Sequence, residues 1–219
     1  MPIRLDERLS KIASLVDYGK VADVGCDHGK LGYFLVSTDR ASKVIATDVS
    51  APSLKKAREL ALENGVIDLI DTRLGDGLEP LSSREVDTVV IAGLGGDVIS
   101  GILEGARQEG KEFAHYLLSP NTHPEKVRAE LARCKHTIVY DDVLVCAGKV
   151  YTIIKTQEGE ETLDANETKY GKFYLTSANF KAQLEREIQN KKNILDKNFS
   201  EELMGKVKDL EALLETLKG

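Results

Sequence analysis

The chain has 219 residues, of which 42% are hydrophobic and 30% charged, and its formal net charge is −6. This length fits one substantial domain with a small appendage, and the composition excludes a disordered protein. No apolar run approaches the roughly 20 residues of a membrane helix, and the first residues do not resemble a signal peptide, so the expected location is cytoplasmic. The negative charge argues against a surface covered by nucleic acid but allows a local basic patch.

Short apolar runs alternate with amphipathic segments through the first 155 residues. We expect helices at residues 5–16, 30–37, 51–64, 98–109 and 123–134. We expect strands at residues 21–24 and 43–47, within 67–74, and at 87–92, 115–119, 137–144 and 149–155. This alternation predicts βαβ units with right-handed crossovers and a mostly parallel sheet. A closing hairpin through residues 146–148 would add one antiparallel strand, a pattern typical of class I methyltransferases, which are variants of the doubly wound Rossmann-like α/β fold.

The composition changes after Lys155. Residues 157–166 are acidic and contain few apolar side chains, which predicts a linker. From Ser177 to Lys218 two helical patterns are separated by a break at residues 196–200, where Ser200 is suited to cap the second helix. We therefore predict a two-helix hairpin or antiparallel coiled coil. The expected domains are a Rossmann-like domain at 1–156 and a linker with a C-terminal helical domain at 157–219.

The loop at residues 23–29, with the sequence DVGCDHG, follows the first expected strand and precedes a helix. Open parallel sheets bind ligands at the carboxyl ends of their strands, and Gly25 lets the backbone turn tightly beside a ligand. Asp27 stands where the dinucleotide motif G-x-G-x-x-G has its second glycine, so the loop suits a cationic amine better than a pyrophosphate. We expect Asp23 and Gly25 to bind S-adenosylmethionine rather than NAD; an ordinary turn remains the alternative.

Acidic residues also follow the second and third expected strands. Asp48 has the spacing from the glycine turn at which a carboxylate binds both ribose hydroxyls, and its alternative role is to cap the next helix. Asp76, followed by Gly77, is a candidate to accept a hydrogen bond from the adenine amino group, and a solvent-exposed turn is the alternative. Both residues are expected to bind the cofactor together with Gly77.

The loops after the fourth and fifth expected strands contribute the remaining candidates. The segment AGLGGD at residues 92–97 leaves the backbone open, so that a flat base can approach the methyl group near Gly93 and Gly95. Its alternative role is a tightly packed helix start. Asn121 offers a donor and an acceptor to a base edge, or it is simply a turn residue.

The sequence does not predict a metal site. The three cysteines, Cys26, Cys134 and Cys146, form no C-x-x-C pair and have no histidine at zinc spacing, which fits buried thiols in a reducing compartment. The four histidines are scattered, and only His28 falls in a candidate site.

These motifs in this order resemble the bacterial tRNA (adenine(22)-N1)-methyltransferases, the TrmK-like family. The matching segments are RLSKIA at 8–13, DVGCDHGKLG at 23–32, ATDVSAPSLKKA at 46–57, DGL at 76–78, IAGLGGDVI at 91–99, LSPN at 118–121 and AGKVYTII at 147–154. The chain departs from the family's usual loops at Cys26, Gly29, Lys30, Gly32, Leu94 and Ser119. Two of the family residues absent here, a tyrosine and a glutamine, are candidate base contacts.

The resemblance implies a class I methyltransferase fold with a C-terminal coiled-coil arm, S-adenosylmethionine as cofactor, and methylation of N1 of an adenine in the D-arm region of tRNA. N1 of neutral adenine carries a lone pair, so catalysis consists mainly of alignment. Asp27 is expected to stabilise the positive charge that develops on the ring, with His28 and Asn121 orienting the base. Basic side chains that could meet phosphates are Arg4, Arg8, Lys11, Lys181, Arg186, Lys191 and Lys192, unless they form an ordinary solvated surface.

Other functions remain open at this point. A methyltransferase acting on a small molecule or a protein would bind the same cofactor without depending on tRNA. A non-catalytic scaffold would bind the cofactor without turnover. The expected partners are tRNA and neither a membrane nor a metal ion, and the sequence does not distinguish a monomer from a dimer.

Overall fold

The computed structural model describes residues 3–217. The helices are α1 (Glu7–Leu15), α2 (Lys30–Ser37), α3 (Ala51–Glu63), α4 (Gly96–Gln108), α5 (Pro124–Arg133), α6 (Ala165–Tyr170), α7 (Ala178–Leu195) and α8 (Glu201–Thr216), with a 3₁₀ turn at Ile67–Leu69. The strands are β1 (Lys20–Val24), β2 (Lys43–Asp48), β3 (Ile70–Leu74), β4 (Thr88–Ala92), β5 (His115–Ser119), β6 (His136–Cys146) and β7 (Lys149–Glu158). None of the helices between residues 3 and 217 is long and apolar enough to cross a membrane.

The strands form one seven-stranded sheet in the order β3-β2-β1-β4-β5-β7-β6. Strands β1 to β5 pair in parallel, whereas β7 runs antiparallel to both β5 and β6. The predicted doubly wound fold with one antiparallel strand is therefore confirmed. The strand order reverses between β1 and β4, which places the topological switch point, the usual ligand site of such sheets, at their carboxyl ends.

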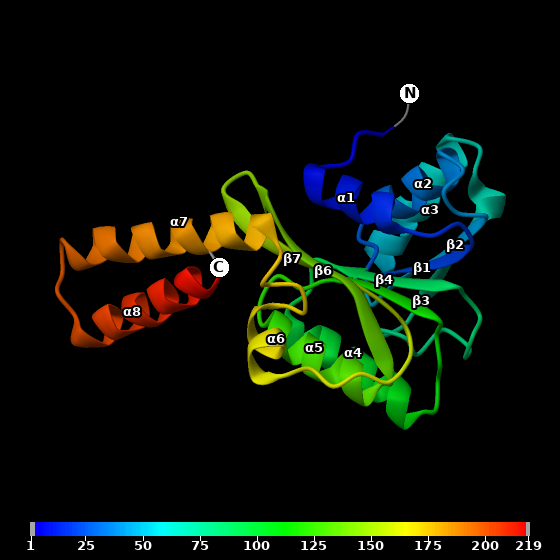
Figure 1. Cartoon of the computed structure of the whole chain (residues 1–219). Coiled ribbons are helices and arrows are strands. Elements are labelled where there is room, and N and C mark those ends of the chain that lie inside the picture. Colours follow the sequence, from blue (N-terminus) through cyan, green and yellow to red (C-terminus); the bar gives the residue numbers. More distant parts are fainter. Residues whose placement is uncertain (1–2, 218–219) are drawn as a thin grey trace.

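Alternating side chains on the central strands pack into two separate hydrophobic cores. Along β4, Val90 packs into the core beneath α1, α2 and α3, while Val89 and Ile91 pack into the core beneath α4 and α5. This period-two pattern explains why both faces of the sheet are covered by helices (Figure 1). Because β4 is buried on both faces, its sequence is a continuous apolar run.

The segment predicted as a linker, residues 157–166, is partly structured and attached to the sheet. Strand β7 extends to Glu158, and α6 begins at Ala165 behind a capping box formed by Asp164 and Glu167. Between them, Glu161 accepts a hydrogen bond from the backbone N–H of Ile138 at 2.9 Å. The acidic composition here reflects caps and paired carboxylates, which sequence composition alone does not distinguish from a solvated linker.

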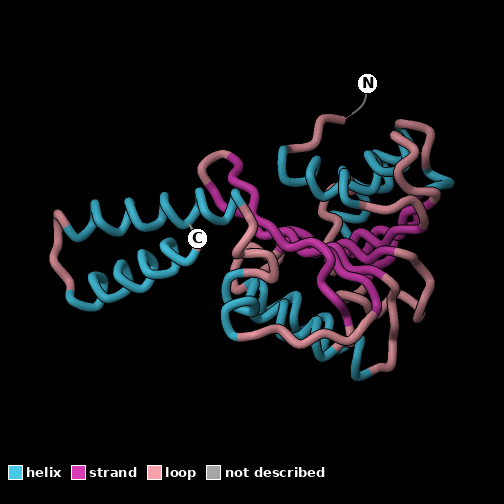
Figure 2. The backbone as a smooth tube through the Cα atoms, viewed as in Figure 1, coloured by secondary structure: helices cyan, strands magenta, loops and turns pink. Residues whose placement is uncertain are grey.

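Helices α7 and α8 form the predicted hairpin, which extends away from the sheet (Figures 1 and 2). Ser200 caps α8 as expected by accepting from the backbone N–H of Leu203, while the predicted helix end at Lys218 lies outside the described residues. At the base of the hairpin, Tyr174 and Phe180 pack on Val143 of β6. The hairpin is thus anchored at one end, and its tip lies far from the sheet.

A buried ion pair joins α5, β6 and the segment that follows α6. Arg128 forms a bidentate contact with Asp141 at 2.7 and 2.9 Å, and the two side chains are only 2% and 1% exposed. Arg128 also donates to the carbonyl oxygens of Thr168 and Lys169, and Asp141 accepts from the backbone N–H of Lys172. Each member of the pair therefore has further hydrogen-bond partners besides the other, which offsets the cost of burying its charge.

Replacing Asp141 with Ala would leave the guanidinium of Arg128 buried without its counter-charge. We expect the free energy of unfolding to fall by about 3–5 kcal/mol, measured by urea denaturation with circular dichroism. The matched control is Glu112→Ala, which removes a partner of the exposed Arg84 and should change stability little. Equal losses in the two variants would contradict the role assigned to the buried pair.

Candidate active site

A cleft of about 550 Å³ lies at the carboxyl ends of the parallel strands and is here called the main cleft. The loops after β1, β2, β3 and β4 all contribute to it. Its lining includes the predicted residues Gly25, Asp27, Asp48, Asp76, Gly77 and Gly93. The structure therefore brings together candidates that are widely separated in the sequence.

The loop after β1 is fixed to the end of β2 by backbone hydrogen bonds. The N–H groups of Gly25 and Cys26 both donate to the carbonyl oxygen of Thr47, at 2.9 and 3.0 Å. Gly25 has a φ of +70°, a conformation that a side chain would strain. This geometry places the backbone of the loop at the floor of the cleft.

The carboxylate of Asp48 is held in place from both sides. Its Oδ2 accepts from the backbone N–H of Asp27 at 3.0 Å, and its Oδ1 accepts from the N–H of Ser50 at 2.8 Å. Ser50, rather than Asp48, caps α3, which resolves the alternative role considered for Asp48. Each oxygen of Asp48 keeps a lone pair for a ligand hydroxyl.

Apolar side chains cover part of the cleft wall. Val49 and Val98 are 67% and 53% exposed, and Ile102 and Leu94 lie beside them in the lining. A Cβ on Gly77 would lie 2.8 Å from Ile102, so only glycine fits that turn. The sequence does not identify these apolar lining residues, because an exposed valine follows the same pattern along the chain as a buried one.

Asp23 lies behind the glycine turn rather than in the cleft lining. Its side chain is buried, and its Oδ2 has no hydrogen-bond partner among the described residues. Burial raises the pKa of Asp23 from 3.8 to about 7, and the nearby charge of Asp48 adds to the rise. A positive charge bound in the cleft would therefore favour the ionised form of this carboxyl group.

Two other candidates face away from the main cleft. Nε2 of His28 lies 3.0 Å from Nζ of Lys56 on α3 and 3.4 Å from Oδ1 of Asp27. Gly95 caps α4 and faces Thr122, and the tight helix start considered for this loop is present. His28 thus contacts Asp27, which lines the main cleft, and Gly95 packs close to Thr122.

A second cleft of about 530 Å³, here called the side cleft, adjoins the main cleft and shares Arg8 and Gly93 with it. Asn121 lies in the side cleft, where its Nδ2 donates to the carbonyl oxygen of Gly93 at 2.6 Å. Tyr151 and Lys149 complete its wall and come from the β6–β7 hairpin. Asn121 therefore links the two clefts.

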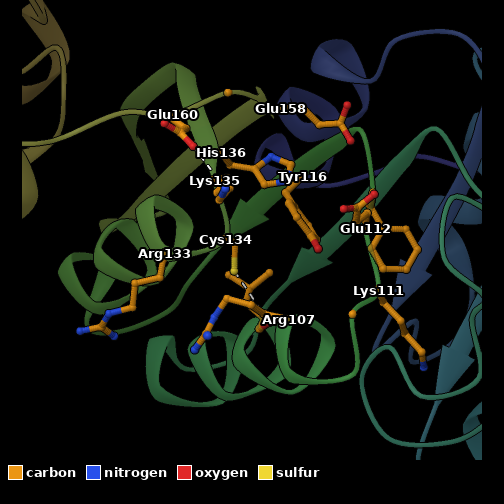
Figure 3. A pocket seen from close by; sticks show the side chains of 14 residues that line it. Arg107, Lys111, Glu112, Tyr116, Arg133, Cys134, Lys135, His136, Glu158 and Glu160 are labelled. Atoms are coloured by element: carbon orange, nitrogen blue, oxygen red, sulfur yellow. Dashed lines mark hydrogen bonds and ion pairs between the residues drawn. The ribbon is translucent and has the colours of Figure 1, made fainter.

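A third cavity, of about 410 Å³, opens at the opposite end of the sheet (Figure 3). Its cations already have partners: Arg107 and Arg133 both pair with Glu130, and Lys135 pairs with Glu160. Burial lowers the pKa of His136, in its wall, from 6.5 to about 4, so that histidine is neutral at pH 7. None of the predicted site residues reaches this cavity, and the main cleft is the better candidate active site.

Among residues 3–217, no group of three or more His, Cys, Asp or Glu side chains is arranged to hold a metal ion.

Comparison with known proteins identifies the family of the chain. The family model described as Methyltransferase domain matches residues 5–154. A tRNA (adenine(22)-N(1))-methyltransferase of Bacillus subtilis (strain 168) is 32% identical over 161 residues, which cover 72% of this chain and 67% of that protein.

Solved structures resemble the whole chain, including the hairpin. The B. subtilis M1A22 tRNA methyltransferase TrmK is 28% identical with a TM-score of 0.78, and the match covers 98% of this chain and 97% of that one. A Streptococcus pneumoniae protein in complex with S-adenosyl-L-methionine is 27% identical with a TM-score of 0.84, and the match covers 96% and 100% of the two chains. The chain therefore belongs to the methyltransferase family that includes the bacterial tRNA (adenine(22)-N(1))-methyltransferases.

Proposed function

We propose that this protein transfers a methyl group from S-adenosylmethionine to N1 of an adenine in the D-arm region of tRNA, which implies a cytoplasmic location. The observation that carries the proposal is the main cleft, where three carboxylates and an apolar wall meet at the switch point of a methyltransferase sheet. The B. subtilis relative is named for this reaction, and the S. pneumoniae relative binds this cofactor.

The residues of the main cleft fit the parts of S-adenosylmethionine. Asp48 would accept from the ribose hydroxyls, and Asp76 would accept from the adenine amino group. Val49 and Val98 offer apolar contacts to the flat adenine ring. The carboxyl of Asp23, whose Oδ2 has no partner among the described residues, lies behind the turn that would receive the cationic amine. Among the described residues, the cleft lining contains no Lys and a single Arg, at its junction with the side cleft, so it does not favour a pyrophosphate.

When bound, the cofactor supplies a methyl group activated by a sulfonium. The protein has to hold the adenine N1 in line with that group, since the lone pair needs no prior deprotonation. Asp27 is 76% exposed at the mouth of the cleft, where its carboxylate would stabilise the positive charge that develops on the base. Asn121 would orient the base edge, and His28 would orient Asp27 rather than touch the base.

Incubation with methyl-labelled S-adenosylmethionine and unmodified tRNA transcripts, followed by nucleoside mass spectrometry, tests the function directly. Labelled N1-methyladenosine is the expected product. Label in a protein or small molecule but not in RNA would favour a different substrate, and cofactor binding with no labelled product would indicate a scaffold.

Asp27→Asn should lower kcat by roughly 10- to 100-fold because it removes the charge that stabilises the transition state. Cofactor affinity should be largely retained, since Asn keeps the shape of the side chain. The control is Asp68→Asn, an exposed carboxylate outside the cleft lining, which should leave kcat unchanged. An unaltered kcat in Asp27→Asn would remove this residue from the mechanism.

Asp48→Asn should weaken binding of S-adenosylhomocysteine by at least about tenfold, because hydrogen bonds to a charged acceptor contribute about 1.5–3 kcal/mol. Isothermal titration calorimetry measures the affinity, again with Asp68→Asn as the control. Equal affinities in the wild type and Asp48→Asn would show that the ribose is held elsewhere.

The raised pKa of Asp23 predicts a pH-dependent stability of the ligand-free protein. The folded state holds this proton more tightly than the unfolded state, so the stabilisation is complete below about pH 4 and is lost as the pH rises through about 7. Asp23→Asn stays neutral at every pH. Between pH 4 and pH 8, the wild type should therefore lose a few kcal/mol of unfolding free energy relative to Asp23→Asn. Urea denaturation measures both unfolding free energies. If their difference is the same at every pH in this range, Asp23 is ionised throughout the range.

A further inference from the structure

Arg8 and Tyr151 form a stacked pair in the side cleft. Cζ of Arg8 lies 4.9 Å from the centre of the Tyr151 ring, and its Nη1 donates to Oδ1 of Asn121 at 3.3 Å. The three residues come from α1, β7 and the loop after β5, so the fold itself assembles this contact. The proposed function leaves the pair without a role.

The contacts of Arg8 are weak for a guanidinium. No ion pair joins it to a carboxylate among the described residues, in contrast to Arg73 and Arg128, which form close carboxylate pairs. A single hydrogen bond at 3.3 Å and one ring contact hold it. Arg8 can therefore leave the ring at little cost when a phosphate is offered instead.

We propose that the face of Tyr151 covered by Arg8 is the stacking surface for the target adenine, and that Arg8 moves to a phosphate of the same nucleotide. This inference rests on the proposed function. A guanidinium is a flat cation, and its place on the ring shows that this face accepts a group of that shape and charge. The side cleft shares Gly93 with the main cleft, so a base on Tyr151 would face the methyl donor.

The reaction places a positive charge on the adenine, and the ring of Tyr151 would stabilise that charge. The N1 lone pair forms the new bond to the methyl carbon, the methyl–sulfur bond breaks with its electron pair remaining on sulfur, and no proton leaves. The adenine ring thus gains one positive charge. Because an aromatic face attracts a cation more strongly than a neutral ring, Tyr151 would bind the transition state more tightly than the substrate.

Lys149 provides a second cation beside this surface. It is exposed at the start of β7, within the lining of the side cleft. On the hairpin, by contrast, Lys191 pairs with Glu187 and Lys192 with Glu211, so part of that charge is already neutralised. Phosphates next to the target adenine would therefore meet Arg8 and Lys149 first.

The test compares the affinities of the protein, without cofactor, for two versions of a tRNA transcript. One carries adenosine and the other N1-methyladenosine at the position that the wild type methylates. Tyr151→Phe should keep the wild-type ratio of the two affinities, whereas Tyr151→Leu should reduce the preference for the methylated RNA about fivefold or more, the effect of losing about 1 kcal/mol of cation–π attraction.

A second replacement distinguishes the loss of the cation–π attraction from misfolding of Tyr151→Leu. Pentafluorophenylalanine at position 151 keeps the shape of the ring but removes its electron-rich face, so it should behave like Tyr151→Leu. Arg8→Gln should weaken binding of both RNAs equally and leave the ratio unchanged, because its proposed partner is a phosphate.

The outcomes separate this inference from the proposed function. A wild type that methylates tRNA, but whose affinity ratio is the same in Tyr151→Leu and in the fluorinated variant, would overturn the role of Tyr151 alone. A ratio changed by Arg8→Gln would overturn the assignment of Arg8 to a phosphate. A wild type that methylates no tRNA would refute the proposed function itself.

Discussion

The main cleft depends on the hydrogen bonds that join the loop after β1 to the end of β2. Thr47 accepts from two consecutive backbone N–H groups of that loop, and Asp48 accepts from a third. Because all three bonds are donated by backbone N–H groups, they do not depend on the side chain of Cys26. The glycines of the loop are less free to vary, since Gly25 has a φ of +70° and a Cβ on Gly29 would lie 2.6 Å from Cβ of Ala57.

Charge is divided between the two adjoining clefts. The main cleft carries Asp27, Asp48 and Asp76, the side cleft carries Lys149, and Arg8 lies where the two clefts meet. A cationic cofactor and an anionic RNA would thus be drawn to neighbouring but different places. A net charge of −6 is compatible with this arrangement, because the basic surface needed near the reacting base is small.

Most of the sheet could be predicted because each strand carries a strong apolar pattern bounded by turn residues. Strand β5 and helix α2 have the predicted bounds, and the loops after β1 to β4 meet as the rule for parallel sheets requires. Helix α6 could not be predicted, since its six residues are mostly polar and it depends on the capping box at Asp164. The orientation of His28 towards Lys56 also depends on packing between α3 and the loop after β1, which spacing along the chain does not encode.

The contacts of Arg128 with backbone carbonyl oxygens limit where the C-terminal hairpin can be exchanged for that of a related protein. The composition of the chain changes near residue 156, but Arg128 donates to backbone oxygens of Thr168 and Lys169. A chimera joined at residue 156 would have to reproduce those oxygens from a foreign segment. Hairpins of related enzymes should therefore be exchanged at the start of α7, beyond Lys172, where the native partners of the buried charge stay in place.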